Sequence, residues 1–143
     1  MKPLYGKVLF NKTDSDVVIA GHRGICALYP ENTMLSFRKA IEAGVDQLEI
    51  DINMTKDREL IIMHDNRVDR TTEKSGPVRQ YTLAEMKQMD AGSHKSYEFR
   101  GEQVPTLSEL LDVVAPTEIS LNVEIKDYTF ETVDKTVRML FDY

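Results

Sequence analysis

The sequence predicts an α/β fold in which a parallel β-sheet is covered by helices. Three observations lead to this prediction. Strand-like and helix-like segments alternate along the 143 residues, two strand-like segments alternate apolar with polar side chains, and several helix-like segments begin with a capping residue. A content of 41% hydrophobic and 29% charged residues is that of an ordinary globular protein, and the length allows one domain with its own core.

The chain begins with a strand and a helix. Residues 17–20 form a short apolar run that ends at a glycine, which indicates a first strand. Apolar residues then recur at helical spacing over residues 34–41. Asn32 or Thr33 can cap the start of this helix, and Gly44 suits its end.

The next part contains two strand candidates and then a long polar connection. Residues 48–54 alternate apolar and polar side chains and form the clearest strand pattern, and residues 60–63 are a second apolar run. Residues 65–104 are polar, and within them only the stretch that Thr82 and Glu85 open with a capping box is typical of a helix. A connection of this length in a compact domain usually serves a function.

Regular structure returns in the last part of the chain. Thr106 and Glu109 form a second capping box before a helix, residues 119–125 alternate as a strand, and residues 130–140 form an amphipathic helix. These segments add up to roughly three βα units, whereas a closed (β/α)₈ barrel takes about 250 residues. The pattern alone therefore leaves two architectures open: a part of a barrel, or a smaller sheet.

The charge and the cysteine content exclude several classes of function. The net charge of -6 argues against a nucleic-acid partner, because there is no basic face to displace counterions from phosphates. An anionic substrate would need local positive charge from Arg, Lys or a metal ion. Cys26 is the single cysteine, so neither an internal disulfide nor a cysteine-based zinc site can form.

No targeting segment is visible in the sequence. Residues 1–16 contain no apolar stretch long enough for a signal peptide, and no run approaches the length of a membrane span. We therefore expect a cytoplasmic protein without a membrane segment in this chain, and leave a membrane-tethered or exported full-length form open.

Three carboxylates are expected to meet at one edge of the sheet. Glu49 and Asp51 are two residues apart, so they share one strand face at a Cα separation of about 7 Å. Glu124 lies near the end of its own strand, as Asp51 does. Carboxylates that face inward are costly without a cation between them, and carboxylate oxygens are the ligands that Ca²⁺ and Mg²⁺ prefer.

Two histidines and two cations fit the same edge. His22 follows the first strand and His64 follows the run at residues 60–63. Two imidazoles beside a bound phosphate can divide the work of general acid and general base near neutral pH. Arg23 and Lys126 can supply positive charge to phosphate oxygens.

Each of these features alone has an ordinary structural explanation. A Glu-x-Asp pair on a strand is a weak metal signal, and a single histidine more often serves structure than catalysis. We interpret Glu31 and Asn32 as helix-entry residues, and Tyr97 and Phe99 either as a pocket lining or as a small local core. The convergence of complementary polar groups at successive strand ends is what favours a functional site.

The sequence resembles the N-terminal part of the catalytic domain of the glycerophosphodiester phosphodiesterase family. The resemblance spans about residues 22–126 and is specific as a set, although each motif alone is weak. It is carried, in order, by His22-Arg23-Gly24, Pro30-Glu31-Asn32-Thr33, Glu49-Ile50-Asp51 with Thr55-Lys56-Asp57, His64-Asp65 and Glu124-Ile125-Lys126.

The resemblance implies a TIM-type (β/α)₈ barrel, of which residues 1–143 are an incomplete N-terminal portion. It implies a small insertion after the second βα region, which residues 65–104 would fill. It also implies hydrolysis of a small-molecule glycerophosphodiester to sn-glycerol 3-phosphate and an alcohol, through a cyclic phosphate. In this scheme Glu49, Asp51 and Glu124 would bind the metal ion, Ca²⁺ or Mg²⁺. His22 and His64 would act as the catalytic acid and base. Arg23 and Lys126 would contact the phosphate.

Two other functions stay open at this point. One is a related metal-dependent phosphodiesterase that acts on lysophospholipids or sphingolipids. The other is a non-catalytic barrel fragment that serves binding or assembly. Because three βα units leave a sheet edge without a partner, we also expect this chain to belong to a longer polypeptide or to associate with another chain.

Overall fold

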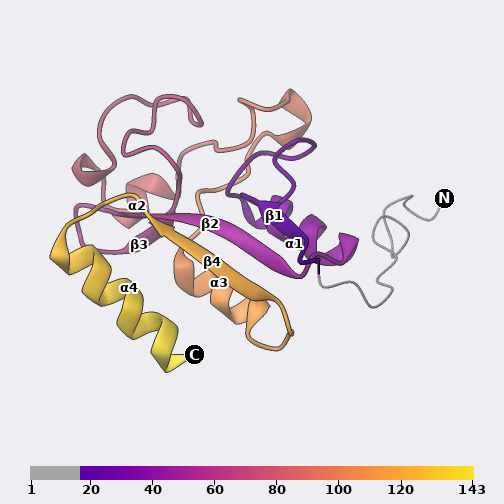
Figure 1. The fold of residues 1–143 in the computed structure, drawn as a ribbon. Helices are drawn as coiled ribbons and strands as arrows, with labels where there is room; N and C mark the ends of the chain where they lie inside the picture. Colours follow the sequence, from indigo (N-terminus) through magenta and orange to yellow (C-terminus); the bar gives the residue numbers. More distant parts are fainter. Residues whose placement is uncertain (1–16) are drawn as a thin grey trace.

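The computed structural model describes residues 17–143, and its centre is a four-stranded sheet (Figure 1). Strands β1 (Ala20–His22) and β4 (Ser120–Ile125) both pair in parallel with β2 (Gln47–Met54), which lies between them. Strand β3 (Leu60–Ile62) pairs with the end of β2 in the antiparallel direction. The expectation for residues 1–16 lies outside the described residues.

A helix follows each parallel strand. Helix α1 (Met34–Ala43) follows β1, α3 (Leu107–Val114) follows β2 after a long connection, and α4 (Phe130–Asp142) follows β4. This order confirms three βα units. In the view of Figure 1 the long connection occupies the upper part of the molecule and α3 and α4 the lower part, with the sheet between them.

The sequence signals at the helix ends act as expected. Thr33 caps α1 by accepting a hydrogen bond from the Ser36 N–H, and Gly44 ends the helix in the left-handed conformation. Thr106 and Glu109 form the capping box of α3. The long connection contains two 3₁₀ turns, η1 (Val78–Gln80) and η2 (Tyr97–Phe99), and the helix α2 (Leu83–Met86), which has its capping box but is shorter than the helical pattern suggests.

The described residues form two hydrophobic clusters. The larger cluster lies between β2 and the helices, where Leu48, Ile50 and Ile52 pack with Phe37 and Leu110. The smaller cluster belongs mostly to the long connection, so that part of the chain has a core of its own. Its buried members are Ile61, Met63, Val68, Val78, Met86, Met89, Ala91 and Val104.

One strand prediction needs correction, and another is confirmed with a direction that the sequence did not give. The first strand is β1, whereas Val17 and Val18 lie before it and are 68% and 64% exposed. Pairing with the start of β2 selects residues 20–22, which apolar character alone does not reveal. The run at residues 60–63 is confirmed as a strand, β3, and it pairs with β2 in the antiparallel direction. The Thr55 N–H donates to the Glu59 carbonyl in a tight turn, and such a turn can join only antiparallel strands.

Helix α4 forms as predicted, but much of its apolar stripe is exposed. Phe130, Val133 and Val137 are 84%, 37% and 42% exposed, while Thr132 and Thr136 are buried. These three apolar residues are therefore exposed, whereas Met139 and Leu140 near the end of the helix pack against the larger cluster. No helix among residues 17–143 combines the length and the apolar character that crossing a membrane requires.

Candidate active site

Three carboxylates meet where β2 and β4 run side by side. Glu49 and Asp51 lie on β2, Glu124 lies on β4, and the strand register pairs Asp51 with Glu124. One ligand oxygen from each carboxylate lies within 4.8 Å of the other two. Asp51 is fully buried, whereas Glu49 is half-buried and Glu124 is exposed. The structure thus brings together the three residues that strand alternation places on one face.

The loop after β1 directs Arg23 toward these carboxylates. Arg23 and Gly24 have φ angles of 51° and 85°, and the left-handed region is unfavourable for a residue with a side chain. The Arg23 N–H offsets part of this cost by donating to the Glu49 carbonyl (3.1 Å) and to its Oε2 (3.0 Å). The Arg23 side chain then lies with Nε 3.3 Å from Asp51 Oδ2.

Gly24 is required in this loop for a second reason. A Cβ atom at this position would lie 2.3 Å from Ser36 Oγ, because the loop packs tightly on the first turn of α1. Ser36 Oγ in turn donates to the Arg23 carbonyl and accepts from the Ile25 N–H. The glycine of the His22-Arg23-Gly24 motif therefore lets the helix hold the loop in place.

The loop before α1 contributes Asn32, whose part in the site the sequence interpretation missed. Asn32 is buried, has φ 54°, and donates from Nδ2 to Asp51 Oδ2 (2.9 Å). The one signal in the sequence is the residue type, since Asn adopts the left-handed conformation more readily than most residues. Asn32 thus joins the helix entry to the buried carboxylate.

The two histidines lie at this edge of the sheet on different elements. His22 ends β1, and its Nε2 lies 3.9 Å from Glu49 Oε2. His64 follows β3, which forms an antiparallel hairpin with the end of β2. The buried Asn53 amide holds this turn by donating to the carbonyl groups of the residues on either side of His64 (2.8 and 3.1 Å). His64 Nδ1 lies 2.7 Å from Asp65 Oδ1.

Lys126 adds the second cation. Its Nζ lies 2.5 Å from Glu124 Oε1 and 3.4 Å from Asp51 Oδ1. The hydrogen bond from Lys126 is the main cause that lowers the pKa of Glu124. Burial lowers the pKa of Lys126, but the hydrogen bond to Glu124 and the charge of Asp51 outweigh this and raise the pKa overall. Both groups are therefore charged at neutral pH.

Unpaired polar atoms gather around Asp51. Among residues 17–143, the buried side-chain atoms without a hydrogen bond are Arg23 Nε, Asn32 Oδ1 and Asp51 Oδ1. Lys126 Nζ, at 3.4 Å from Asp51 Oδ1, is too distant for a good hydrogen bond. A buried carboxylate oxygen in this state is costly, and an all-oxygen set suits a hard divalent cation. The residues present therefore fit Ca²⁺ or Mg²⁺.

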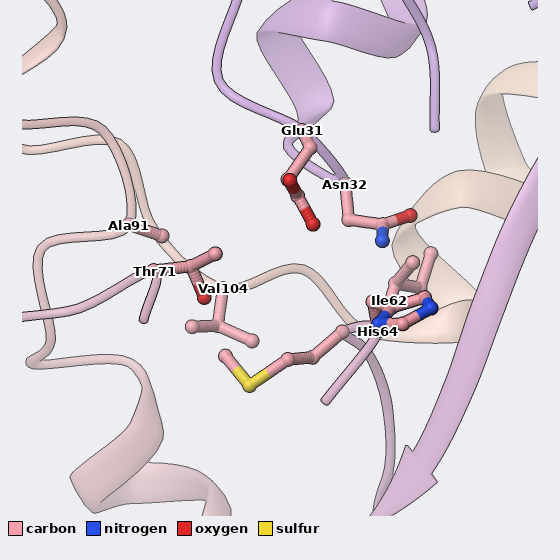
Figure 2. Close-up of a pocket in the computed structure, with 8 residues that line it drawn as sticks. Glu31, Asn32, Ile62, His64, Thr71, Ala91 and Val104 are labelled. Atoms are coloured by element: carbon pink, nitrogen blue, oxygen red, sulfur yellow. The ribbon is translucent and has the colours of Figure 1, made fainter. Parts of the chain in front are cut away.

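A small cavity adjoins the site beside His64. Figure 2 shows Glu31 and Asn32 on one side of it and Thr71, Ala91 and Val104 on the other. The last three residues belong to the connection between β3 and α3, which therefore contributes to the surroundings of His64. The complete lining is Glu31, Asn32, Ile62, Met63, His64, Thr71, Ala91 and Val104.

The acidic, basic and histidine side chains of this site lie together at one edge of a parallel sheet, where the sites of barrel enzymes are found. The model of the glycerophosphoryl diester phosphodiesterase family matches residues 22–141. The chain belongs to this family.

Relatives and solved structures agree with this membership. A glycerophosphodiester phosphodiesterase of Caldanaerobacter subterraneus is 41% identical over 109 residues, which are 76% of this chain and 45% of that protein. The structure of an Oleispira antarctica phosphodiesterase in complex with the product sn-glycerol-3-phosphate is 36% identical, with a TM-score of 0.82 over 87% of this chain and 52% of that one. A glycerophosphodiester phosphodiesterase structure from Agrobacterium tumefaciens is 32% identical, with a TM-score of 0.79 over 87% and 54% of the two chains.

These matches confirm the predicted fold class, a part of a TIM-type barrel. The sheet and its helices correspond to about half of each related structure, so the three parallel strands are an incomplete barrel. The chain likewise spans about half the length of the curated relatives it matches.

Proposed function

We propose that this chain supplies the catalytic groups of a metal-dependent enzyme that hydrolyses glycerophosphodiesters to sn-glycerol 3-phosphate and an alcohol. The observation that carries the proposal is the meeting of Glu49, Asp51 and Glu124 beside two histidines, in a chain of this family. The product in the Oleispira antarctica structure supports the same reaction.

The carboxylates Glu49, Asp51 and Glu124 would hold the divalent cation. Their oxygen-only donor set and the unpaired Asp51 Oδ1 support this assignment. A bound Ca²⁺ or Mg²⁺ would neutralise the negative charge of the phosphodiester oxygens.

Arg23 and Lys126 would bind and orient the phosphate from two sides. Arg23 Nε lies 3.3 Å from one oxygen of Asp51 and Lys126 Nζ lies 3.4 Å from the other, so the two cations flank the same carboxylate. A phosphate placed there would exchange weak contacts with Asp51 for charge-assisted hydrogen bonds.

His22 and His64 would move the protons. One histidine takes the proton of the glycerol 2-hydroxyl as its oxygen attacks phosphorus, and the other gives a proton to the departing alcohol oxygen. Water then opens the cyclic phosphate by the same transfers in reverse order. The contact between His64 Nδ1 and Asp65 supports this role, since it leaves Nε2 available for proton transfer.

We also infer that residues 65–104 are the small insertion of this family, within one partial domain of residues 1–143. Their separate core and the cavity wall beside His64 support this inference. Lys95 donates to the carbonyls of Cys26 and Ala27, so the insertion also supports the loop that follows His22.

The test is a hydrolysis assay with glycerophosphocholine and glycerophosphoethanolamine, with and without EDTA. We expect release of sn-glycerol 3-phosphate, its loss with EDTA and its return when Ca²⁺ or Mg²⁺ is added. Cleavage of lysophosphatidylcholine or sphingomyelin alone would instead indicate the related lipid phosphodiesterase. Metal binding without any hydrolysis would indicate a binding module.

A further inference from the structure

Arg70 lies in the insertion and contacts two acidic residues from different loops. Its Nε and Nη2 donate to Asp65 Oδ2 (2.9 Å) and Oδ1 (3.0 Å). Its Nη1 and Nη2 donate to Glu31 Oε2 (2.8 Å) and Oε1 (2.8 Å). Both carboxylates are thus held through both oxygens, an arrangement that the planar guanidinium allows and an ammonium does not.

Each of these carboxylates contacts a residue of the candidate site. Asp65 Oδ1 lies 2.7 Å from His64 Nδ1. Glu31 Oε1 accepts from Arg23 Nη1 at 3.0 Å, and Arg23 reaches Asp51. Arg70 therefore connects the histidine on one side of the site with the phosphate-binding candidate on the other.

The pKa values of Asp65 and Glu31 agree with this role of Arg70 as the connecting residue. The hydrogen bond from Arg70 is the main cause that lowers the pKa of Asp65 to about 2. Burial raises the pKa of Glu31, but the hydrogen bond and charge of Arg70 lower it overall. Without Arg70, the carboxylates of Asp65 and Glu31 would repel each other. The contact between Asp65 and His64 would then be weaker.

We propose that Arg70 is a positioning residue that fixes the tautomer of His64 by holding Asp65 against its Nδ1. A carboxylate only accepts, so Nδ1 keeps its proton and Nε2 presents its lone pair to the site. In the same way Arg70 keeps Glu31 on Arg23. This role rests on the proposed function, because it matters for catalysis only if His64 transfers protons.

The test observes the His64 tautomer directly. Long-range proton–nitrogen NMR spectra of the whole chain, labelled in histidine, are recorded at about pH 8.5, well above the ordinary histidine pKa. A His64→Gln variant assigns the signal among the three histidines. The parent should show the Nδ1–H form of His64. Asp65→Asn should shift His64 toward the Nε2–H form, and Arg70→Gln should turn the single form into a mixture.

Two further variants make the test specific. Arg67→Gln is the matched control, because Arg67 lies three residues earlier and its guanidinium pairs with Asp69, and it should leave the tautomer unchanged. Glu31→Gln leaves the residues His64 and Asp65 in place but removes one of the two carboxylates that hold Arg70. It should therefore shift the His64 tautomer in the same direction as Arg70→Gln, by a smaller amount. Circular dichroism checks that each variant is folded. If Arg70→Gln unfolds, Arg70→Lys takes its place, since Lys cannot hold two carboxylates in bidentate fashion.

The outcomes separate this proposal from the proposed function. An unchanged Nδ1–H form in folded Arg70→Gln or Arg70→Lys, while Asp65→Asn alters it, would overturn the positioning role. In the hydrolysis assay Arg70→Gln should lower kcat, because proton transfer by His64 is impaired, and any rise in KM should come from the loosened Arg23. A parent chain that hydrolyses no phosphodiester would count against the proposed function alone, because the NMR measurement needs no substrate.

Discussion

Most contacts of the site converge on Asp51. This carboxylate is fully buried, accepts a hydrogen bond from Asn32 and lies near Arg23 and Lys126. Burying a charge costs several kcal/mol unless hydrogen bonds and counter-charges offset it. Because Oδ1 still lacks a hydrogen bond, the side chains of the described residues compensate this charge only in part. The uncompensated part of the negative charge of Asp51 favours binding of a divalent cation.

Glu49→Ala should weaken divalent metal binding severely and abolish hydrolysis, since it removes one of three converging carboxylates. Isothermal titration with Ca²⁺ and Mg²⁺ measures the first effect and the hydrolysis assay the second. Glu42→Ala is the matched control, because Glu42 lies on α1 and pairs with Lys39, away from the site. Equal metal affinity in Glu49→Ala and the parent would refute the ligand assignment.

His22→Ala and His64→Ala should separate proton transfer from metal binding. Each should lower turnover by ~10²-fold or more if the two residues act as acid and base. Metal affinity should stay close to that of the parent, because neither imidazole belongs to the carboxylate cluster. Near-parental turnover in either variant would remove that histidine from the mechanism.

Two short elements decide how these side chains meet. The loop from β1 to α1 places Arg23 and Asn32 in left-handed conformations over Asp51. The hairpin of β2 and β3 returns the chain so that the Met63 N–H donates to the Asp51 carbonyl (2.9 Å), which leaves His64 at the rim. Neither element is long, and both depend on a few residues with a special backbone conformation.

Gly24→Ala should destabilise the fold more than Gly44→Ala. Both glycines have positive φ, near 85° and 84°, so each alanine costs about 1–2 kcal/mol in backbone strain. A Cβ at Gly44 meets nothing within 4 Å, whereas one at Gly24 meets Ser36 Oγ at 2.3 Å, which adds roughly 1–3 kcal/mol of overpacking. Urea unfolding of both variants measures the difference. Equal losses would show that Ser36 can move aside freely.

At the scale of the whole molecule, one side of the sheet is open. Within the described residues β4 pairs with β2 along one edge and with no other strand. The exposed apolar residues of α4, Phe130, Val133, Val137 and Phe141, belong to the helix that follows this strand. An unpaired strand beside an apolar helix face favours pairing with more protein.

We therefore predict that the 143-residue chain associates in solution at micromolar concentration. Sedimentation velocity should show a species larger than the 16.4 kDa monomer. Phe130→Glu with Val137→Glu should shift the distribution toward monomer, because both changes place charge on the exposed stripe. A compact parent monomer that melts cooperatively would show that this half-barrel needs no partner.

The sequence by itself determined the elements and the chemical groups of this protein. The alternation in residues 48–54, the caps Thr33 and Thr106 and the stop at Gly44 are local signals, and local backbone preference suffices to place them. The three carboxylates could be predicted to converge because alternation and parallel pairing leave one geometry for them.

Only the tertiary structure decided which of the neighbouring residues serve these groups. Whether residues 60–62 pair in parallel or antiparallel depends on a turn, and whether residues 17–20 or 20–22 form the first strand depends on the register with β2. Asn32 and Arg70 join the site through contacts between residues far apart in the chain: Asn32 and Asp51 are 19 residues apart, and Arg70 and Glu31 are 39 residues apart. Such contacts leave no periodic trace in a sequence, because they depend on how the loops pack and not on where each residue lies along its own element.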